Sequence, residues 1–325
     1  MKKPVFSVTY NQTDISTWLS PFCLRVEYVD HLHEKSDGLE IKVEDAAGRW
    51  RGPWYPTKGD TLTHLMGYGG EVALPCGSFQ IDEIEMSGPP DTVVLRALGA
   101  GIRKAVRTKN SQAYEGKTLA QVAALLAGQN GLTIIGTVPN LPFKRVTQHR
   151  ETDLTFLRRL AREYGAVFSV RGSNITFQDL DTLEAMAPVL TMERSDFKGL
   201  SLKDKTHNVY GQVESKYWDP ETKQMVVGQA AATGTDSRDT LRLRRRAESA
   251  AHSNRQAHAA LKFHTGWQIG GTLQAEGNPL LCSGNNLQLG NSFGVFAGLY
   301  QITDSRHQME RDRGYATEIE VRRVR

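Results

Sequence analysis

The chain is poor in cysteine and has no long apolar run. Its 325 residues include 3 cysteines, Cys23, Cys76 and Cys282, spaced widely along the sequence. An odd and sparse set of this kind indicates a reducing compartment and argues against a disulfide scaffold. No window is apolar enough for a membrane-spanning helix, so we expect no membrane insertion. The N-terminus has two lysines but lacks the apolar stretch of a signal peptide, which predicts synthesis in the cytoplasm.

The chain also lacks the sequence motifs of common enzymes. It has no nucleophile elbow, no phosphate-binding P-loop and no dinucleotide fingerprint. His31, His33 and Glu34 lie close together, but no second ligand pair accompanies them, so we interpret them as a loop. We therefore predict no catalytic, cofactor-binding or metal-binding residues. The net charge of +4 does not by itself indicate nucleic-acid binding, and we interpret the arginines at residues 242–246 and 322–325 as solvated surface.

What the chain does contain is many glycines and short stretches of alternating apolar and polar residues. Its 30 glycines favour turns. In residues 1–100, strand patterns recur between turn residues at fairly even spacing, with Leu39, Ile41 and Val43 expected to face the core. Such spacing is typical of a β-sandwich or a β-barrel.

The most informative stretch is residues 77–97. Apolar positions alternate with polar ones up to Ile81 and then shift by one, to Ile84. An extra residue at Asp82 or Glu83 would produce this shift, so we predict a β-bulge there. A glycine and two prolines follow, and proline lacks the backbone N–H that a strand ladder needs. We therefore predict a turn between two strands.

Residues 101–182 change character and predict a small α/β unit. Thr118 begins the pattern of a helix capping box. An amphipathic helix follows at residues 152–164, with Gly165 placed to end it. A β-hairpin is then expected around residues 172–174.

Residues 183–325 return to strand patterns, with one long helical candidate among them. We predict a long strand at residues 207–218, which a hairpin connects to residues 224–228. Residues near 236–262 are predicted to form a helix, because they contain many leucines and alanines but no glycine or proline.

Three of these stretches resemble the phage late control gene D family. They read FQIDEIEMSGPPDT at residues 79–92, ETDLTFLRRLAREYG at residues 151–165, and GNPLLCSG at residues 277–284 followed by GYATEIE at residues 314–320. Members of this family are baseplate hub proteins of contractile phage tails and of phage-tail-like bacteriocins. They are related more distantly to the hub portion of VgrG spikes in type VI secretion.

The resemblance implies a mainly β fold with an α+β insert. Two tail-tube-like β-barrel domains, at residues 1–100 and 183–325, would be joined by a helix-hairpin insert at residues 101–182. It also implies a homotrimer that adapts the hexameric tail tube to the trimeric central spike. The expected partners are the tail tube protein and the central spike protein, and also the tape-measure protein and other baseplate proteins.

By the same resemblance, the protein would be made in the bacterial cytoplasm and assembled into the baseplate of a phage or a bacteriocin. The implied role is structural, without catalysis and without specific nucleic-acid binding. Two alternatives stay open. Glu83 and Glu85 lie on one strand face, about 7 Å apart from the rise per residue, a separation that suits the paired carboxylates of a tail-associated peptidoglycan hydrolase. The arginines of residues 242–246 would instead suit a nucleic-acid-binding late regulator.

Aromatic residues are the best candidates for contacts with partners. Trp50, Trp54 and Tyr55 lie in a loop rich in proline and glycine, and Tyr217 and Trp218 lie at the expected tip of a hairpin. Rigid aromatic side chains often anchor interfaces, while burial in a core would explain the same tryptophans. We predict these five as interface residues.

Overall fold

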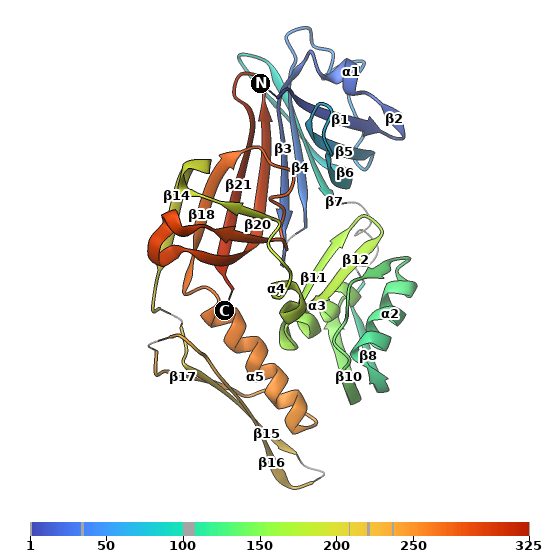
Figure 1. Cartoon of the computed structure of the whole chain (residues 1–325). Helices are drawn as coiled ribbons and strands as arrows, with labels where there is room; N and C mark the ends of the chain where they lie inside the picture. The colour runs from blue at the N-terminus through green and yellow to red at the C-terminus, as the bar shows by residue number, and fades with distance from the viewer. Residues whose placement is uncertain are drawn as a thin grey trace.

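The computed structural model describes residues 2–33, 36–99, 108–207, 209–219, 222–235 and 237–324. Within these ranges the protein is mainly β, with a large, mostly antiparallel sheet of 13 strands, three small sheets and a few helices (Figure 1). The strand order along the large sheet is β14-β18-β21-β20-β3-β4-β7-β6-β5-β1-β2, and β13 and β19 attach beside β20.

The N-terminal residues form one half of the large sheet. Its elements are β1 (Pro4–Tyr10), β2 (Thr13–Asp14), α1 (Ser16–Leu19), β3 (Cys23–His31), β4 (Gly38–Glu44), β5 (Thr61–Tyr68), β6 (Leu74–Ser87) and β7 (Thr92–Gly99). Alternate side chains of the strands other than β2 face one apolar core. Leu39, Ile41 and Val43 are buried there as predicted, together with Phe79.

The C-terminal residues form the other half. Its elements are β13 (Leu190–Met192), η1 (Arg194–Asp196), β14 (Phe197–Asp204), β18 (Ile269–Glu276), β19 (Asn286–Leu289), η2 (Asn291–Phe296), β20 (Gly298–Glu310) and β21 (Gly314–Arg323). A second apolar core lies on this half, around Leu273, Ile302 and Val321.

The two halves are joined into one continuous sheet. Strand β20 pairs antiparallel with β3, from Asp304 opposite His31 to Glu310 opposite Arg25. The strand path runs from β14 to β2, and these two end strands are not paired with each other. The prediction of a mainly β fold is confirmed. The prediction of two closed barrels is not: among the described strands, the two β regions are joined through the β3–β20 ladder into one open sheet.

The predicted β-bulge is confirmed. Strand β6 pairs with β7, and the register shifts between Ile81 and Glu83. The two strands are connected by a four-residue turn that contains both prolines. The extra residue lets Phe79 and Ile84 both pack against the same core, although they lie at an odd spacing.

The middle of the chain forms a compact α/β unit. Its elements are β8 (Asn110–Thr118), α2 (Leu119–Gln129), β9 (Thr133–Ile135), β10 (Pro142–Glu151), α3 (Asp153–Glu163), β11 (Ala166–Arg171), β12 (Asn174–Asp179) and α4 (Leu180–Glu184). The capping box of Thr118 is confirmed, since its hydroxyl accepts a hydrogen bond from the backbone N–H of Gln121, 3.2 Å away. Gly165 follows α3 with φ +69°, the conformation that favours glycine at a helix end. The predicted hairpin is also confirmed, as β11 and β12.

A three-stranded sheet and a helix form a projecting unit that we call the arm. It consists of β15 (Gln212–Asp219), β16 (Gln224–Ala231), β17 (Thr240–Leu243) and α5 (Ala250–Thr265). Figure 1 shows it pointing away from the large sheet, with the end of β15 and the start of β16 at its far end. No helix in the described part of the chain is both long and apolar enough to cross a membrane.

Two predictions for the arm are wrong in their boundaries. The helix expected near residues 236–262 begins only at Ala250, and residues 240–243 are a strand that pairs in parallel with β15. Leu241 and Leu243 alternate with arginines, which is a strand period, and both side chains pack against the core of the arm. The expected helix start at Asp236 lies outside the described residues. The long strand expected at residues 207–218 begins at Gln212.

Candidate functional site

An apolar pocket of about 340 Å³ lies beside the N-terminal half of the large sheet. Trp50, Trp54 and Tyr55, from the loop between β4 and β5, line it together with Trp18 of α1. The structure thus brings together three predicted contact residues and one that the sequence analysis missed. The sequence alone does not single out Trp18, because α1 comes close to this loop only when β1 pairs with β5 in the folded chain.

The four aromatic side chains differ in exposure, and this separates their roles. Trp50 is 8% exposed and belongs to the core, so core burial explains it. Tyr55 is 56% and Trp18 71% exposed, so these two rings form the accessible rim. Trp54 lies between, edge-on to Trp50 with ring centres 5.7 Å apart. A pocket of this kind can receive an apolar side chain from another molecule.

Polar contacts hold the loop of the pocket in place. The buried Asp45 carboxylate accepts a hydrogen bond from the backbone N–H of Trp50, at 2.9 Å. The guanidinium of Arg49 lies over the Trp54 ring, 5.0 Å from its centre. These two contacts hold the loop and its aromatic side chains in place within the folded chain. The pocket therefore forms without a partner.

The second pair of predicted contact residues lies in the arm. Trp218 is near the end of β15 and is 54% exposed, whereas Tyr217 is half-buried. Neighbouring residues of a strand face opposite sides, so only Trp218 is placed on the open side of the hairpin.

The glutamates that suggested a hydrolase are both bridged by one arginine. Arg96 of β7 places its Nη1 2.7 Å from a carboxylate oxygen of Glu83 and 2.7 Å from one of Glu85. The hydrogen bond from Arg96 lowers the pKa of the Glu85 carboxyl. A general acid needs its pKa raised, so this arrangement matches the solvated, paired strand face and not a glycosidase pair.

The histidines near residue 31 do not converge. The Nδ1 of His31 lies 2.5 Å from a carboxylate oxygen of Asp304, while the His33 ring packs on Phe263 with centres 5.5 Å apart. Glu34 lies outside the described residues. Across the described ranges, no three His, Cys, Asp or Glu side chains are grouped to hold a metal ion.

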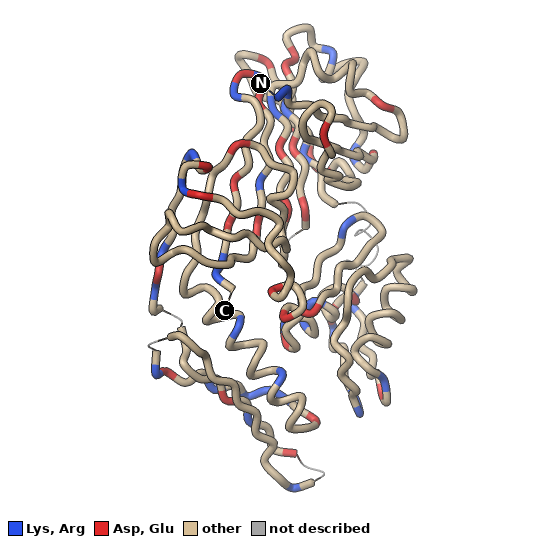
Figure 2. The backbone as a smooth tube through the Cα atoms, in the orientation of Figure 1, with Lys and Arg blue, Asp and Glu red and all other residues tan. Residues whose placement is uncertain are grey.

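The predicted arginine surfaces have different outcomes. Residues Arg242 to Arg246 include four exposed arginines, and Arg242 is 79% exposed, as expected of a solvated surface. Figure 2 marks the positions of the basic and acidic residues along the backbone. The prediction is wrong for Arg322, which is buried and contacts Glu184 and Gln301. Its partner Glu184 lies 138 positions away along the chain, so local sequence could not reveal the contact.

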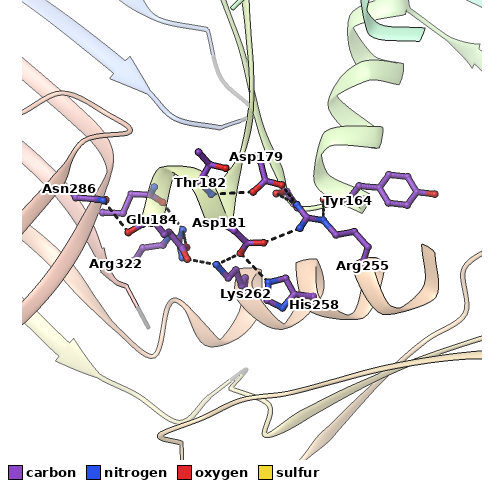
Figure 3. Close-up of polar contacts among 12 residues, drawn as sticks. Tyr164, Asp179, Asp181, Thr182, Glu184, Arg255, His258, Lys262, Asn286 and Arg322 are labelled. Atoms are coloured by element: carbon purple, nitrogen blue, oxygen red, sulfur yellow. Dashed lines mark hydrogen bonds and ion pairs between the residues drawn. The ribbon is translucent and has the colours of Figure 1, made fainter. Parts of the chain in front are cut away.

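Figure 3 shows a cluster of charges where α5 meets the end of β12 and α4. We call it the polar joint; its members are Asp179, Asp181, Glu184, Arg255, His258, Lys262 and Arg322. The bases of α5 are spaced by three and four residues, so they share one face of the helix. The acids belong to the α/β unit and Arg322 to the large sheet, so the cluster connects three parts of the molecule.

Asp181 is the centre of the polar joint. Its carboxylate lies 2.9 Å from Nη1 of Arg255 and 3.0 Å from Nε2 of His258, and it also pairs with Lys262. The hydrogen bond from His258, with further help from Lys262, holds the pKa of Asp181 well below its ordinary value. Two cations and a histidine on one carboxylate therefore fix this face of α5 against α4.

A second junction connects the α/β unit to both halves of the sheet. Arg171, at the end of β11, pairs with the buried Asp30 and places Nε 3.0 Å from a carboxylate oxygen of Asp37. Asp30 also accepts hydrogen bonds from the backbone N–H and the hydroxyl of Ser283, at 2.9 and 2.7 Å. Burial, and then the nearby Asp30 charge, raise the pKa of Asp37 to about 6.

Comparisons with known proteins agree on one family. Residues 99–312 match the family described as phage tail baseplate hub (GPD). A probable baseplate hub protein of Escherichia phage 186 is 28% identical over 199 residues, which cover 59% of this chain and 50% of that protein. The chain thus spans about half the length of the curated relatives it matches.

Solved structures share the fold across nearly the whole chain. The 43 kDa tail protein of prophage MuSo2 from Shewanella oneidensis has a TM-score of 0.73 at 13% identity, covering 99% of each chain. A chain of the Francisella PdpA-VgrG complex has a TM-score of 0.58 at 8% identity, covering 100% of this chain and 53% of that one. At these identities the likeness concerns the fold alone, and it extends to a chain of a complex that contains VgrG.

Proposed function

This chain belongs to the phage tail baseplate hub (GPD) family, and from that premise we propose that it is the structural hub of a contractile tail baseplate. In this role it forms a homotrimer that adapts the hexameric tail tube to the trimeric central spike. Membership of the family is the observation that carries the proposal. The role is structural, without catalysis, membrane insertion or specific nucleic-acid binding.

The division of the chain fits such an adaptor. Residues 1–100 and 183–325 act as two tube-like β domains, and residues 101–182 act as the insert between them. The presence of two separate apolar cores supports this division, although the first core also includes Met309 of β20 and Tyr315 of β21. Three copies would present six similar β units to a sixfold partner and a threefold arrangement to the spike.

The aromatic residues act as contact points in this proposal. Tyr55, with Trp54 and the buried Trp50 behind it, forms one contact, and Trp218, with Tyr217, forms another. The high exposure of Tyr55 and Trp218 supports this, because large exposed aromatic rings are enriched where partners bind. The partners are the tail tube and central spike proteins, with the tape-measure and other baseplate proteins as further candidates. The particle, a phage or a bacteriocin, is assembled in the bacterial cytoplasm.

The test measures the oligomeric state and the incorporation of the protein into particles. We expect the purified chain to form a trimer when the tube and spike proteins are present, and electron microscopy to place it between tube and spike. A chain that stays monomeric and is absent from assembled tails would contradict the proposal.

A double variant refines the assembly test. Trp18→Ala with Tyr55→Ala removes both rim rings of the pocket and should reduce incorporation into tails without unfolding the protein. Val72→Ala is the matched control, since Val72 is 88% exposed and lies outside the pocket. Equal incorporation of the double variant and the control would exclude the pocket as a contact, while leaving the hub role intact.

A further inference from the structure

We propose that the aromatic pocket binds a small, uncharged molecule with an apolar body of about two fused rings and one hydrogen-bond acceptor. The aromatic pocket is the apolar cavity of about 340 Å³ that Trp18, Trp50, Trp54 and Tyr55 line beside the N-terminal half of the large sheet. This ligand site goes beyond the proposed hub function and does not depend on it, because the pocket is formed by a single chain.

The floor of the aromatic pocket is part of the protein core. Val8 of β1, Ile41 of β4, Leu62 of β5 and Leu95 of β7 all line it. Each of these side chains is 4% exposed or less, and all belong to the apolar core of the N-terminal half. The pocket is therefore a recess that reaches the strands of the sheet, and preformed apolar recesses are the usual sites of small-molecule binding.

The volume of the pocket sets the size of the ligand. An apolar cavity of about 150 Å³ is enough to hold one benzene ring. At about 340 Å³, the aromatic pocket has room for two fused rings and a small substituent. Water in an apolar pocket finds few hydrogen-bond partners, so an apolar ligand that displaces this water gains free energy.

The pocket offers no charge to a ligand. None of the described residues that line it is charged. Most of its walls come from residues 8–19 and 41–62. These two segments carry equal numbers of acidic and basic residues, Asp14, Glu44, Asp45 and Asp60 against Lys42, Arg49, Arg51 and Lys58. A charged group inside the pocket would lose its hydration without gaining a partner, so we infer an uncharged ligand.

The aromatic rings do not make the pocket a cation site. Clusters of tryptophan and tyrosine can bind cations through their ring faces. Here the guanidinium of Arg49 already lies over the Trp54 ring, 5.0 Å from its centre, and would repel a second cation. The carboxylate of Asp60 already accepts hydrogen bonds from the hydroxyl of Tyr10 and from the backbone N–H of Thr57, the latter at 3.1 Å.

A buried donor indicates that the ligand carries an acceptor. Trp50 lines the pocket and is 8% exposed, and its indole N–H is buried without a hydrogen-bond partner among the described residues. Such a donor costs free energy until it is paired. A carbonyl or ether oxygen of a ligand would supply the missing partner. The other polar group on the inner wall, the hydroxyl of Tyr10, already donates to Asp60.

The test uses the purified full chain and naphthalenes that differ in one substituent at the same ring position, with binding measured by isothermal titration calorimetry. Acetylnaphthalene has two rings and one carbonyl acceptor, and should bind with a Kd of about 100 µM or lower. Isopropenylnaphthalene has the same shape without the acceptor and should bind about three- to tenfold more weakly. Naphthoate, an anion, and naphthamidine, a cation, should each bind at least about tenfold more weakly.

Two protein variants separate the donor from the aromatic wall. Trp50→Phe keeps a ring but removes the N–H, so acetylnaphthalene should lose its preference over isopropenylnaphthalene. Trp18→Ala removes a ring that is 71% exposed and should weaken both ligands by about threefold or more. Val72→Ala, at an 88% exposed position outside the pocket, is the matched control and should leave both affinities unchanged. Circular dichroism checks that each variant is folded; if Trp50→Phe is not, the two ligands on the natural chain still test the acceptor.

Each outcome decides the proposal. No saturable binding of acetylnaphthalene at about 500 µM overturns it, and so does equal or tighter binding of naphthoate or naphthamidine. Equal binding of acetylnaphthalene and isopropenylnaphthalene to the natural chain overturns the acceptor. Tighter binding of N-acetyltryptophan amide than of acetylnaphthalene would identify a partner's side chain as the occupant and also overturn the proposal. If no naphthalene binds but Trp18→Ala with Tyr55→Ala still lowers incorporation into tails, the ligand-site inference falls while the hub function stands.

Discussion

The large sheet and the arm are held together by different physical means. The N-terminal half of the sheet buries large apolar side chains, including Phe79, Ile41 and Ile81, each almost completely inaccessible. The arm has a core built on Val213, Ala257 and Leu261, with smaller alanine side chains packed around it. Since stabilisation scales with the apolar area removed from water, the sheet is the stable body of the protein.

The arm relies instead on backbone contact and on charges. Gly228 allows β16 to touch α5, and the polar joint connects α5 to α4 and to Arg322 of the large sheet. Units with few buried apolar contacts open at lower free energy than the global core. The difference indicates that the large sheet is rigid and that the arm can unfold locally while the sheet stays folded. Such local freedom suits a contact surface at the end of the arm.

The largest expected effect is on the sheet. Phe79→Ala removes a ring that is 1% exposed, and we expect the free energy of unfolding to fall by about 3–5 kcal/mol. Chemical denaturation followed by tryptophan fluorescence measures this. Met86→Ala, on the same strand but 55% exposed, is the matched control and should change it by about 0.5 kcal/mol or less. Similar losses for both variants would mean that the core does not dominate the stability of the sheet.

The next effect concerns the arm. Gly228→Ala places a Cβ against the backbone of Ser253 and Asn254, and overpacking of this kind costs about 1–3 kcal/mol. Hydrogen exchange followed by mass spectrometry should show faster exchange in β15, β16 and α5, with the large sheet unchanged. Gly128→Ala in α2 is the control, because its Cβ would meet nothing within 4 Å. Faster exchange throughout the chain would show that the arm and the sheet unfold as one unit.

The sequence predicts features that are decided by neighbouring residues. The bulge after Ile81, the cap at Thr118 and the glycine after α3 all follow from spacing and backbone chemistry within a few positions. Prediction from the sequence fails where a residue far away in the chain determines the local structure or the burial of a side chain. Residues 240–243 become a strand because β15 lies beside them, and Arg322 is buried because Glu184 receives it.

The candidate sites show the same limit. The aromatic loop at residues 50–55 could be picked out by composition, but its pocket also needs Trp18 from α1. In the polar joint, the three- and four-residue spacing of Arg255, His258 and Lys262 indicates one charged helix face. Nothing in that spacing identifies the acids of β12 and α4 as its partners, because these are brought close only by the folded α/β unit.

A smaller, pH-dependent effect should distinguish the two charged junctions. Asp181 has a pKa held below its unfolded value, so its contribution to stability is present above about pH 4 and is lost as the pH falls further. Asp37 has its pKa raised to about 6. The folded chain therefore takes up a proton there before the unfolded chain does, and this contribution to the free energy of unfolding rises as the pH falls from about 6 to about 4.

Hydrogen exchange across this pH range measures both junctions. We expect α5 to lose protection as the pH falls below about 4, while the region around Arg171 gains protection between about pH 6 and about pH 4. In Asp181→Asn, α5 should already exchange faster at neutral pH, with little further change on acidification. In Asp37→Asn the gain around Arg171 should disappear. An unchanged acid response of α5 in Asp181→Asn would show that Asp181 does not tether the arm.

The smallest effect on stability is expected at Trp218. This residue therefore gives the clearest test of the difference between the large sheet, which is held by buried side chains, and the exposed end of the arm. Trp218→Ala removes a ring that is already 54% exposed and lies on the side of β15 turned away from α5, so the free energy of unfolding should change by about 0.5 kcal/mol or less. Incorporation into tails should nevertheless fall, because the ring is available only to a partner. Trp50→Ala should behave in the opposite way, with a large loss of stability, since Trp50 is buried in the core. If Trp218→Ala destabilised the chain as much as Trp50→Ala, the ring would be a structural part of the arm and not a contact residue.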